Sequence, residues 1–254
     1  MYIIFDTETT GLPKRWDAPI TDTDNWPRCI QLAWQIHDEM GNLVEHHDFL
    51  IKPDGFDIPY DSEKIHGIST ALAEEQGLPL QEVLEKFNVA LNKAKFVVGQ
   101  NIGFDLNIMG CEFYRYGVTS NMANMPVLDT CTEVTAELLK IPGGRGGRFK
   151  LPNLTELHSY LFGVPFAEAH NATADVEATT RCFLELVRRE VFTAEELQVD
   201  TGYFVDFKTN NPGPIPTVGL KHINLKAASD EIRKRSQPDE VKVVVDADAL
   251  AALK

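Results

Sequence analysis

The stretch at residues 5–12, FDTETTGL, constrains the fold of this chain more than any other segment. It continues an apolar, β-forming run and ends in a turn sequence, which predicts a buried strand that enters a turn. Because side chains alternate across a strand, Asp6 and Glu8 should point to one side and Thr7 to the other. Two carboxylates in one small patch repel each other, and a divalent cation relieves the conflict through the hard oxygen ligands that Mg²⁺ and Mn²⁺ prefer. The pair is a candidate half of a metal site, although Asp-x-Glu on an exposed strand face is also common without a metal.

Strand-like and helix-like segments follow one another along the next 180 or so residues. Two β-rich segments flank the turn sequence Glu-Met-Gly-Asn, so they should form an antiparallel hairpin beside the first strand. A helical pattern, a short buried strand and a second helix come next. The elements expected after the first strand are strands at 29–37, 43–51, 96–99 and 125–130, and helices at 80–95, from about 103 to 116, up to 139, at 154–161 and at 172–190.

Three residues far from the first strand are further site candidates. Asp105 falls in the first turn of a helix that follows a strand, and this edge of an α/β sheet is where ligands usually bind. His170 precedes Asp175 by five residues. Five residues of helix rotate through about 500°, which would leave these two side chains roughly 140° apart. We therefore expect His170 in the loop before the helix.

These residues together resemble the DEDD superfamily of 3′→5′ exonucleases. FDTETTGL matches its first motif, VGQNIGFDLNIM at 98–109 its second, with Gln100 where many relatives have His, and HNATADVEAT at 170–179 its third. The spacing His-x-x-x-x-Asp is that of the histidine branch, which includes the proofreading epsilon subunit of bacterial DNA polymerase III, ribonuclease T and oligoribonuclease. The resemblance covers about residues 1–190. It implies a ribonuclease-H-like α/β fold, whose mixed five-stranded sheet has three antiparallel and then two parallel strands, with helices on both faces.

The resemblance also implies roles for individual residues. Asp6, Glu8, Asp105 and Asp175 would hold two Mg²⁺ or Mn²⁺ ions, which in such enzymes lie about 4 Å apart. His170 would be the general base that takes a proton from the attacking water. The residues that the resemblance places around the terminal nucleotide are Thr7, Thr9, Leu12, His66, Asn101 and Phe104.

Composition limits the kind of nucleic-acid contact to expect. The net charge is −14, which is unusual for a duplex-binding protein because phosphate contacts come from Lys and Arg. A small catalytic pocket that touches a single-stranded or frayed 3′ end remains compatible with it. The four cysteines have no Cys-x-x-Cys spacing, so we expect neither a zinc site nor a disulfide framework. Without a basic-then-apolar leader or a run of about 18 apolar residues, we expect no membrane segment and a cytoplasmic location.

Two loops have more than one interpretation. Residues 13–28 are rich in turn formers and aromatic residues, and Trp16 and Trp26 in this loop could stack on bases or pack it against the body. Residues 142–150 form a glycine-rich basic loop that could touch phosphates or serve as a solvated connector.

The composition and periodicity of the sequence change near residue 192. We place an exonuclease domain at 1–192 and a linker with a C-terminal tail, a candidate docking or connector segment, at 193–254. Because the catalytic motifs end by Asp175, we expect the tail not to complete the active site. Residues 220–226 and 16–28 resemble parts of bacterial polymerase III alpha chains that carry such an exonuclease at their N-terminus.

The function predicted is metal-dependent 3′→5′ hydrolysis of DNA to nucleoside monophosphates, with proofreading in replication and polymerase III subunits as candidate partners. An RNA-trimming exonuclease would share every catalytic residue. A non-catalytic nucleic-acid-binding scaffold is a third alternative, against which the intact set of five residues argues.

Overall fold

The computed structural model describes residues 1–166, 171–221 and 223–236. Its strands are β1 (Tyr2–Thr9), β2 (Cys29–His37), β3 (Leu43–Leu50), β4 (Phe96–Gly99) and β5 (Val127–Asp129). Its α-helices are α1 (Tyr60–His66), α2 (Thr70–Gln76), α3 (Leu80–Leu91), α4 (Gly103–Tyr116), α5 (Glu133–Leu139), α6 (Leu154–Phe162), α7 (Ala172–Arg188), α8 (Ala194–Leu197), α9 (Tyr203–Asn210) and α10 (Leu225–Ser236), with 3₁₀ turns η1 (Met122–Asn124) and η2 (Arg145–Gly147).

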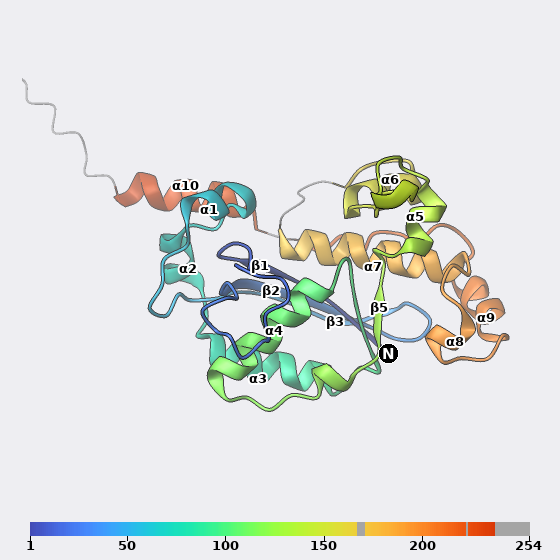
Figure 1. Ribbon diagram of the computed structural model, residues 1–254, viewed down its shortest axis with the longest axis horizontal. Coiled ribbons are helices and arrows are strands. Elements are labelled where there is room, and N and C mark those ends of the chain that lie inside the picture. The colour runs from blue at the N-terminus through green and yellow to red at the C-terminus, as the bar shows by residue number, and fades with distance from the viewer. Residues whose placement is uncertain (167–170, 222, 237–254) are drawn as a thin grey trace, which may run out of the picture.

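A single five-stranded sheet of order β3-β2-β1-β4-β5 forms the centre of the molecule. The first three strands pair antiparallel, and β4 and β5 continue the sheet parallel to β1. Helix α7 lies along one face of the sheet, and α3 and α4 cover the other (Figure 1). The predicted mixed sheet with helices on both faces is therefore confirmed.

The alternation of β1 divides the hydrophobic core into two layers. Tyr2 and Ile4 belong to the cluster on the α7 face, where the Tyr2 ring meets Phe183 edge-on at 5.0 Å between centroids. Phe5 belongs to the opposite cluster, where its ring meets Phe87 of α3 at 5.0 Å. The strand is thus buried on both faces, and its last residues carry the same alternation into the site.

Segments beyond residue 192 pack on this core. Leu197 of α8 and Phe207 of α9 are fully buried in the cluster on the α7 face. The Tyr203 hydroxyl donates to the carbonyl of Glu39 at 2.6 Å. The domain division at residue 192 stays a prediction, but described residues on both sides of it share one hydrophobic cluster.

Helices α1, α2, α8, α9 and α10 were not expected from the sequence. The first four have eight residues or fewer, which is too short for a clear helical period. Helix α10 lies beside α1 and α2 (Figure 1), where Leu225 and Ile232 complete a third small cluster with Ile68 and Leu72. No helix in the described ranges is both long and apolar enough to cross a lipid bilayer.

Candidate active site

Three carboxylates meet where β1 passes the start of α7. Asp6 and Glu8 follow Tyr2 and Ile4 in the two-residue period of β1, so they continue the face that α7 covers. Asp175 lies in the first turn of α7. One ligand atom from each of these three residues lies within 4.8 Å of the others. The pairing of β1 with β2 shifts register between Glu8 and Thr9, and such a bulge at a strand end re-aims the side chains next to it.

The position of α7 is set by polar contacts at its first residues. Asn171 caps the helix by accepting a hydrogen bond from the Thr173 amide at 3.1 Å. Gln31, which pairs with Glu8 across the sheet, accepts from the Ala172 amide at 3.2 Å. These bonds tie the helix that carries Asp175 to the strand beside the carboxylates.

Asp105 approaches the same site from the other face of the sheet. Thr7 points away from Asp6 and Glu8, and both its amide and its hydroxyl donate to Asp105 Oδ1, at 2.9 and 2.6 Å. Thr7 and Asp105 are 6% and 5% exposed, so this contact is buried. The structure therefore brings Asp105 to the strand through Thr7, while the group of three is formed by the residues of the α7 face.

The electrostatics of the site are those of crowded carboxylates. Burial, reinforced by the charges of Asp105, Asp175 and Glu8, raises the pKa of Asp6 well above its usual range. Burial and the charges of Asp175 and Asp105 raise the pKa of Glu8 to about 8. Burial also raises the pKa of Asp105 to about 7, although the hydrogen bonds from Thr7 act in the opposite direction. Within the described ranges no Lys or Arg forms an ion pair with Asp6, Glu8 or Asp105.

These residues fit a divalent metal. The donors are all carboxylate oxygens, as Mg²⁺ and Mn²⁺ prefer, and they converge within the span of one coordination sphere. A cation bound there would also offset both the burial and the mutual repulsion that raise the pKa values of Asp6 and Glu8. Asp6, Glu8 and Asp175 would hold one ion, and Asp105 lies close enough to Asp6 and Glu8 to influence the charge of both.

The turn that leads into α4 is held by a carboxylate that the sequence interpretation missed. Asp129, the last residue of β5, accepts hydrogen bonds from the amides of Asn101 and Cys131 at 2.8 and 2.7 Å. Asn101 has the left-handed φ of 55°, which Asn tolerates better than most residues. Asp129 thus fixes the backbone just before Asp105. Because β5 ends at the same edge of the sheet as β4, its position at a strand's carboxyl end was the available signal.

Comparison with a family model identifies the family of this chain. The model of the exonuclease family, whose description is "Exonuclease", matches residues 3–183, which include Asp6, Glu8, Asp105 and Asp175. The chain belongs to this exonuclease family.

Relatives and solved structures agree with this membership. The chain is 29% identical over 186 residues to the DNA polymerase III PolC-type protein of Pediococcus pentosaceus, and 28% identical over 237 residues to that of Streptococcus thermophilus. These alignments cover 73% and 93% of the chain, which spans only 11% and 13% of the two relatives. Escherichia coli Exonuclease I, solved in complex with a dA16 oligonucleotide, has a similar fold, with a TM-score of 0.57 and 21% identity over 78% of this chain and 42% of that one.

The predicted substrate residues of this exonuclease-family chain differ in their exposure to solvent. Leu12 is 73% exposed and Phe104 is half-buried, whereas Thr9 is buried and closes the turn by donating to the Gly11 carbonyl at 2.7 Å. His66 ends α1, and its Nδ1 accepts from the Ile68 amide at 3.0 Å. The Thr7 amide and hydroxyl both donate to Asp105, and the predicted contact of Thr7 with substrate stays a prediction.

Two further predictions concern the second and third motifs. His170, the predicted general base, lies outside the described residues. Gln100, which stands where many relatives have His, donates to the Pro152 carbonyl at 2.8 Å and accepts from the Thr130 hydroxyl. Gln100 is therefore used to join the turn before α4 to its neighbours.

The glycine-rich basic loop at 142–150 lines a pocket of about 370 Å³ beside α5. Two of its three cations are paired with acidic residues: Arg148 with Glu133, and Lys150 with Glu156. Both pairs are at least partly exposed to solvent and such pairs are weak, so the phosphate-contact and connector interpretations of this loop both stay predictions.

Proposed function

We propose that this chain is a metal-dependent 3′→5′ exonuclease that hydrolyses DNA and releases nucleoside monophosphates. The observation that carries the proposal is the convergence of Asp6, Glu8 and Asp175 within 4.8 Å, in a chain that belongs to the exonuclease family. The raised pKa values of Asp6 and Glu8 show that their charged forms are destabilised where they lie. A purely structural cluster would gain nothing from such an arrangement. This argues against a non-catalytic scaffold.

We assign the residues of the site separate roles in phosphodiester hydrolysis. Divalent ions bound at such a site supply charge neutralisation at phosphorus, activation of water and support for the leaving 3′ oxygen. Asp6, Glu8 and Asp175 would hold one ion and Asp105 would support a second, which gives the two-metal arrangement. His170 is proposed as the general base that accepts the proton of the attacking water. Thr7 keeps Asp105 in place with two hydrogen bonds.

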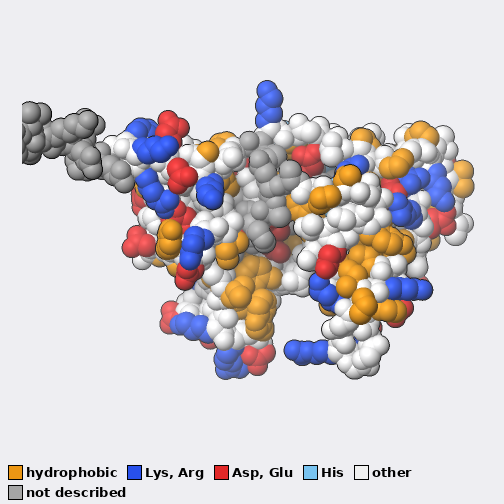
Figure 2. Space-filling view, turned by 90° about the horizontal axis from the view of Figure 1, so that it is seen from above, with side chains coloured by type: hydrophobic (Ala, Val, Ile, Leu, Met, Phe, Trp, Pro, Cys, Tyr) orange, Lys and Arg blue, Asp and Glu red, His pale blue; other side chains and the backbone are white. Residues whose placement is uncertain are grey.

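DNA is the proposed substrate because the relatives are PolC-type DNA polymerases, with RNA as the alternative that the test must address. Contacts should be local and limited to a single-stranded or frayed 3′ end. On the face drawn in Figure 2, Lys and Arg side chains are interspersed with Asp and Glu, and the net charge is −14. Such a surface is poorly suited to gripping a duplex.

A role in replication proofreading, with subunits of a DNA polymerase III as partners, is proposed on the same relatives. The chain corresponds to a small share of each of them, so their polymerase activity is not attributed to it. A cytoplasmic location would follow from this role.

Matched oligonucleotides test the proposal. Linear single-stranded DNA should be shortened from its 3′ end in Mn²⁺ or Mg²⁺, and a circular strand of the same sequence should resist. Excess chelator should stop the reaction. Faster digestion of the matched RNA would indicate an exoribonuclease. Equal cleavage of circular and linear strands would indicate an endonuclease. No digestion of any substrate would favour the non-catalytic scaffold.

A further inference from the structure

One exposed indole stands beside the catalytic residues without a role so far. Trp16 is 61% exposed, whereas the other two tryptophans, Trp26 and Trp34, are 3% and 1% exposed. Its ring centroid lies 5.8 Å from that of Phe104, with the planes inclined at 53°. Phe104 immediately precedes Asp105, so the indole contacts the residue next to one of the site carboxylates. Single exposed apolar side chains are common on protein surfaces, so the contact with Phe104 is what distinguishes this indole.

The loop that carries Trp16 is braced at its base. The Thr10 amide donates to the Arg28 carbonyl at 3.0 Å, and the Arg28 amide donates back to the Thr10 hydroxyl at 2.9 Å. Higher in the loop, Asn25 accepts from the Arg15 amide at 2.8 Å and donates to the Arg15 carbonyl at 2.9 Å. Trp16 therefore follows a residue whose backbone is held on both sides.

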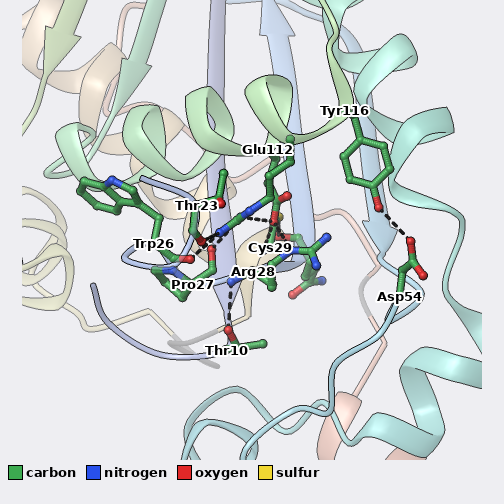
Figure 3. A network of polar contacts seen from close by, with 11 residues as sticks. Thr10, Thr23, Trp26, Pro27, Arg28, Cys29, Asp54, Glu112 and Tyr116 are labelled. Carbon is green, nitrogen blue, oxygen red and sulfur yellow. Dashed lines mark hydrogen bonds and ion pairs between the residues drawn. The ribbon is translucent and has the colours of Figure 1, made fainter. Parts of the chain in front are cut away.

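A buried ion cluster holds the far arm of the same loop. Glu112 of α4 is fully buried and accepts from Arg28 Nε at 3.0 Å and from the Cys29 amide at 2.9 Å (Figure 3). Arg115, one turn further along α4, donates to the carbonyls of Thr23 and Trp26 at 2.5 and 2.6 Å. The loop is thus fixed to the helix whose first turn carries Phe104 and Asp105. The backbone of the loop that carries the indole is therefore braced without a ligand.

We propose that Trp16 stacks on the base next to the 3′-terminal nucleotide of a single-stranded substrate. This inference rests on the proposed exonuclease function, and it adds a residue that determines substrate length and strandedness. Phe104 is half-buried, precedes Asp105 in the chain and contacts the indole, so a terminal nucleotide held at Phe104 would leave the following base nearest to Trp16. Stacking on an indole needs only the π-face of a base, which a single strand offers and a paired duplex does not. The exposed Lys14 on the same loop suits the adjoining phosphates.

Steady-state kinetics on a single-stranded DNA 10-mer test the contact. Trp16→Ala should raise KM by at least about fivefold, the lower end of the effect of losing one base–aromatic stack, with kcat nearly unchanged. Trp16→Phe should restore most of the affinity. Tyr114→Ala is the matched control. Tyr114 is 55% exposed and lies on α4, the helix that carries Phe104, about 15 Å from Phe104 along the helix axis. This variant should behave like the parent.

An abasic substrate locates the stacked base. If the second nucleotide from the 3′ end lacks its base, parent and Trp16→Ala should have the same KM, since the variant removes a contact that the substrate no longer offers. A fivefold difference that persists on the abasic substrate would overturn the assignment to that base.

Fluorescence gives a measurement that does not depend on hydrolysis. In chelator, acrylamide should quench mainly the exposed Trp16, and the 10-mer should protect this emission in the parent but leave Trp16→Phe unaffected. A parent that digests the strand while its emission and the kinetics of Trp16→Ala stay unchanged would refute the stacking role alone. A parent that shows protection but no digestion of any substrate would refute the proposed catalysis and leave the stacking role standing.

Discussion

At the scale of single residues, the chemistry of this site depends on the two faces of β1, which carry different side chains. Asp6 and Glu8 face α7 and meet Asp175, while Thr7 faces α4 and binds Asp105 with two hydrogen bonds. A hydrogen bond to a buried carboxylate is charge-assisted, which makes it shorter and stronger than one between neutral groups. Thr7 is therefore as much a part of the site as Asp6 and Glu8, the carboxylates on either side of it.

Thr7→Val tests this positioning role because the two side chains have nearly the same shape. Loss of the hydroxyl removes the 2.6 Å bond to Asp105 Oδ1, so the pKa of Asp105 should rise further and the carboxylate should lose its orientation. We expect turnover, or the apparent affinity for Mn²⁺, to fall about 10- to 100-fold, as for other residues that orient a ligand. Thr7→Ser, which keeps the donor, should stay near the parent. Parental activity in Thr7→Val would contradict the role.

His170 and Asp175 should differ in what their loss changes. As a base outside the ligand set, His170 should affect proton transfer, so His170→Ala should lower the rate by roughly 10²- to 10⁴-fold with unchanged metal dependence. Asp175→Ala should weaken metal binding as well, since Asp175 lies within the carboxylate group. Metal titrations of both variants, followed by initial rates, separate the two roles. A His170→Ala protein that needs much more metal than the parent would place His170 among the ligands instead.

At the scale of elements, residues 211–221 and 223–236 contact both α7 and the end of α1. They first run along α7, where Arg181 donates to the Ile215 carbonyl at 2.7 Å and Asn171 to the Ile223 carbonyl at 3.3 Å. They then form α10, where the Ser229 hydroxyl donates to the Gly67 carbonyl at 2.7 Å, next to His66. The start of α7 and the end of α1 are thus connected by the same stretch of chain.

Two truncated chains compare how much α10, and the helices α8 and α9, contribute to the free energy of unfolding. A chain that ends at Val218 loses α10 and with it the buried Leu225 and Ile232, each worth about 1.5–3 kcal/mol of burial, so it should fold with a lower midpoint of unfolding. A chain that ends at Glu190 also loses Leu197 and Phe207 from the main core. We expect it to be far less stable, although the catalytic motifs are intact. Urea unfolding of both proteins decides this.

Leu225→Ala in the full chain is the matched control for α10. A buried leucine truncated to alanine costs about 2–5 kcal/mol, so this variant should lose stability comparable to the loss of the helix. A Glu190 truncation as stable as the Val218 truncation would show that α8 and α9 add nothing to the core, and the predicted independence of residues 1–192 would then stand.

For the whole molecule, the carboxylate site links stability to pH and metal. Folding raises the pKa of Glu8 to about 8, so without metal the folded state holds more protons than the unfolded state between about pH 4.5 and pH 8. The free energy of unfolding should therefore fall as pH rises through this window. Metal binding requires the deprotonated carboxylates, so Mn²⁺ should raise the melting temperature more at pH 8 than at pH 5.5.

Melting curves in chelator and in Mn²⁺ check this linkage. Glu8→Gln removes one titrating group at the same shape, so its melting temperature in chelator should fall less between pH 5.5 and 8 than that of the parent. It should also gain less from Mn²⁺. An equal pH dependence in parent and variant would mean that Glu8 is not protonated in the metal-free protein.

Several features of this protein follow from local sequence. The period of two in β1 places Asp6 and Glu8 on one side of the strand, and this was confirmed because the strand is regular up to its bulge after Glu8. Helices such as α3, α4 and α7 have apolar positions at helical spacing, which is a property of neighbouring residues and needs no tertiary information. Their order, together with the hairpin, agrees with the mixed sheet that the family resemblance implied.

Only the tertiary structure decided which distant groups meet. Asp105 is 98 residues from Thr7, and Glu112 is 84 residues from Arg28, so no local pattern records either contact. The same holds for α10, whose place beside α1 depends on Leu225 and Ile232 filling a gap over Ile68. Local propensity and periodicity act within a turn or a strand, whereas pairing across the fold depends on which buried surfaces and polar groups can satisfy each other once the chain is compact. For this reason the carboxylates could be found from the sequence, and the residues that hold them and Trp16 in place could not.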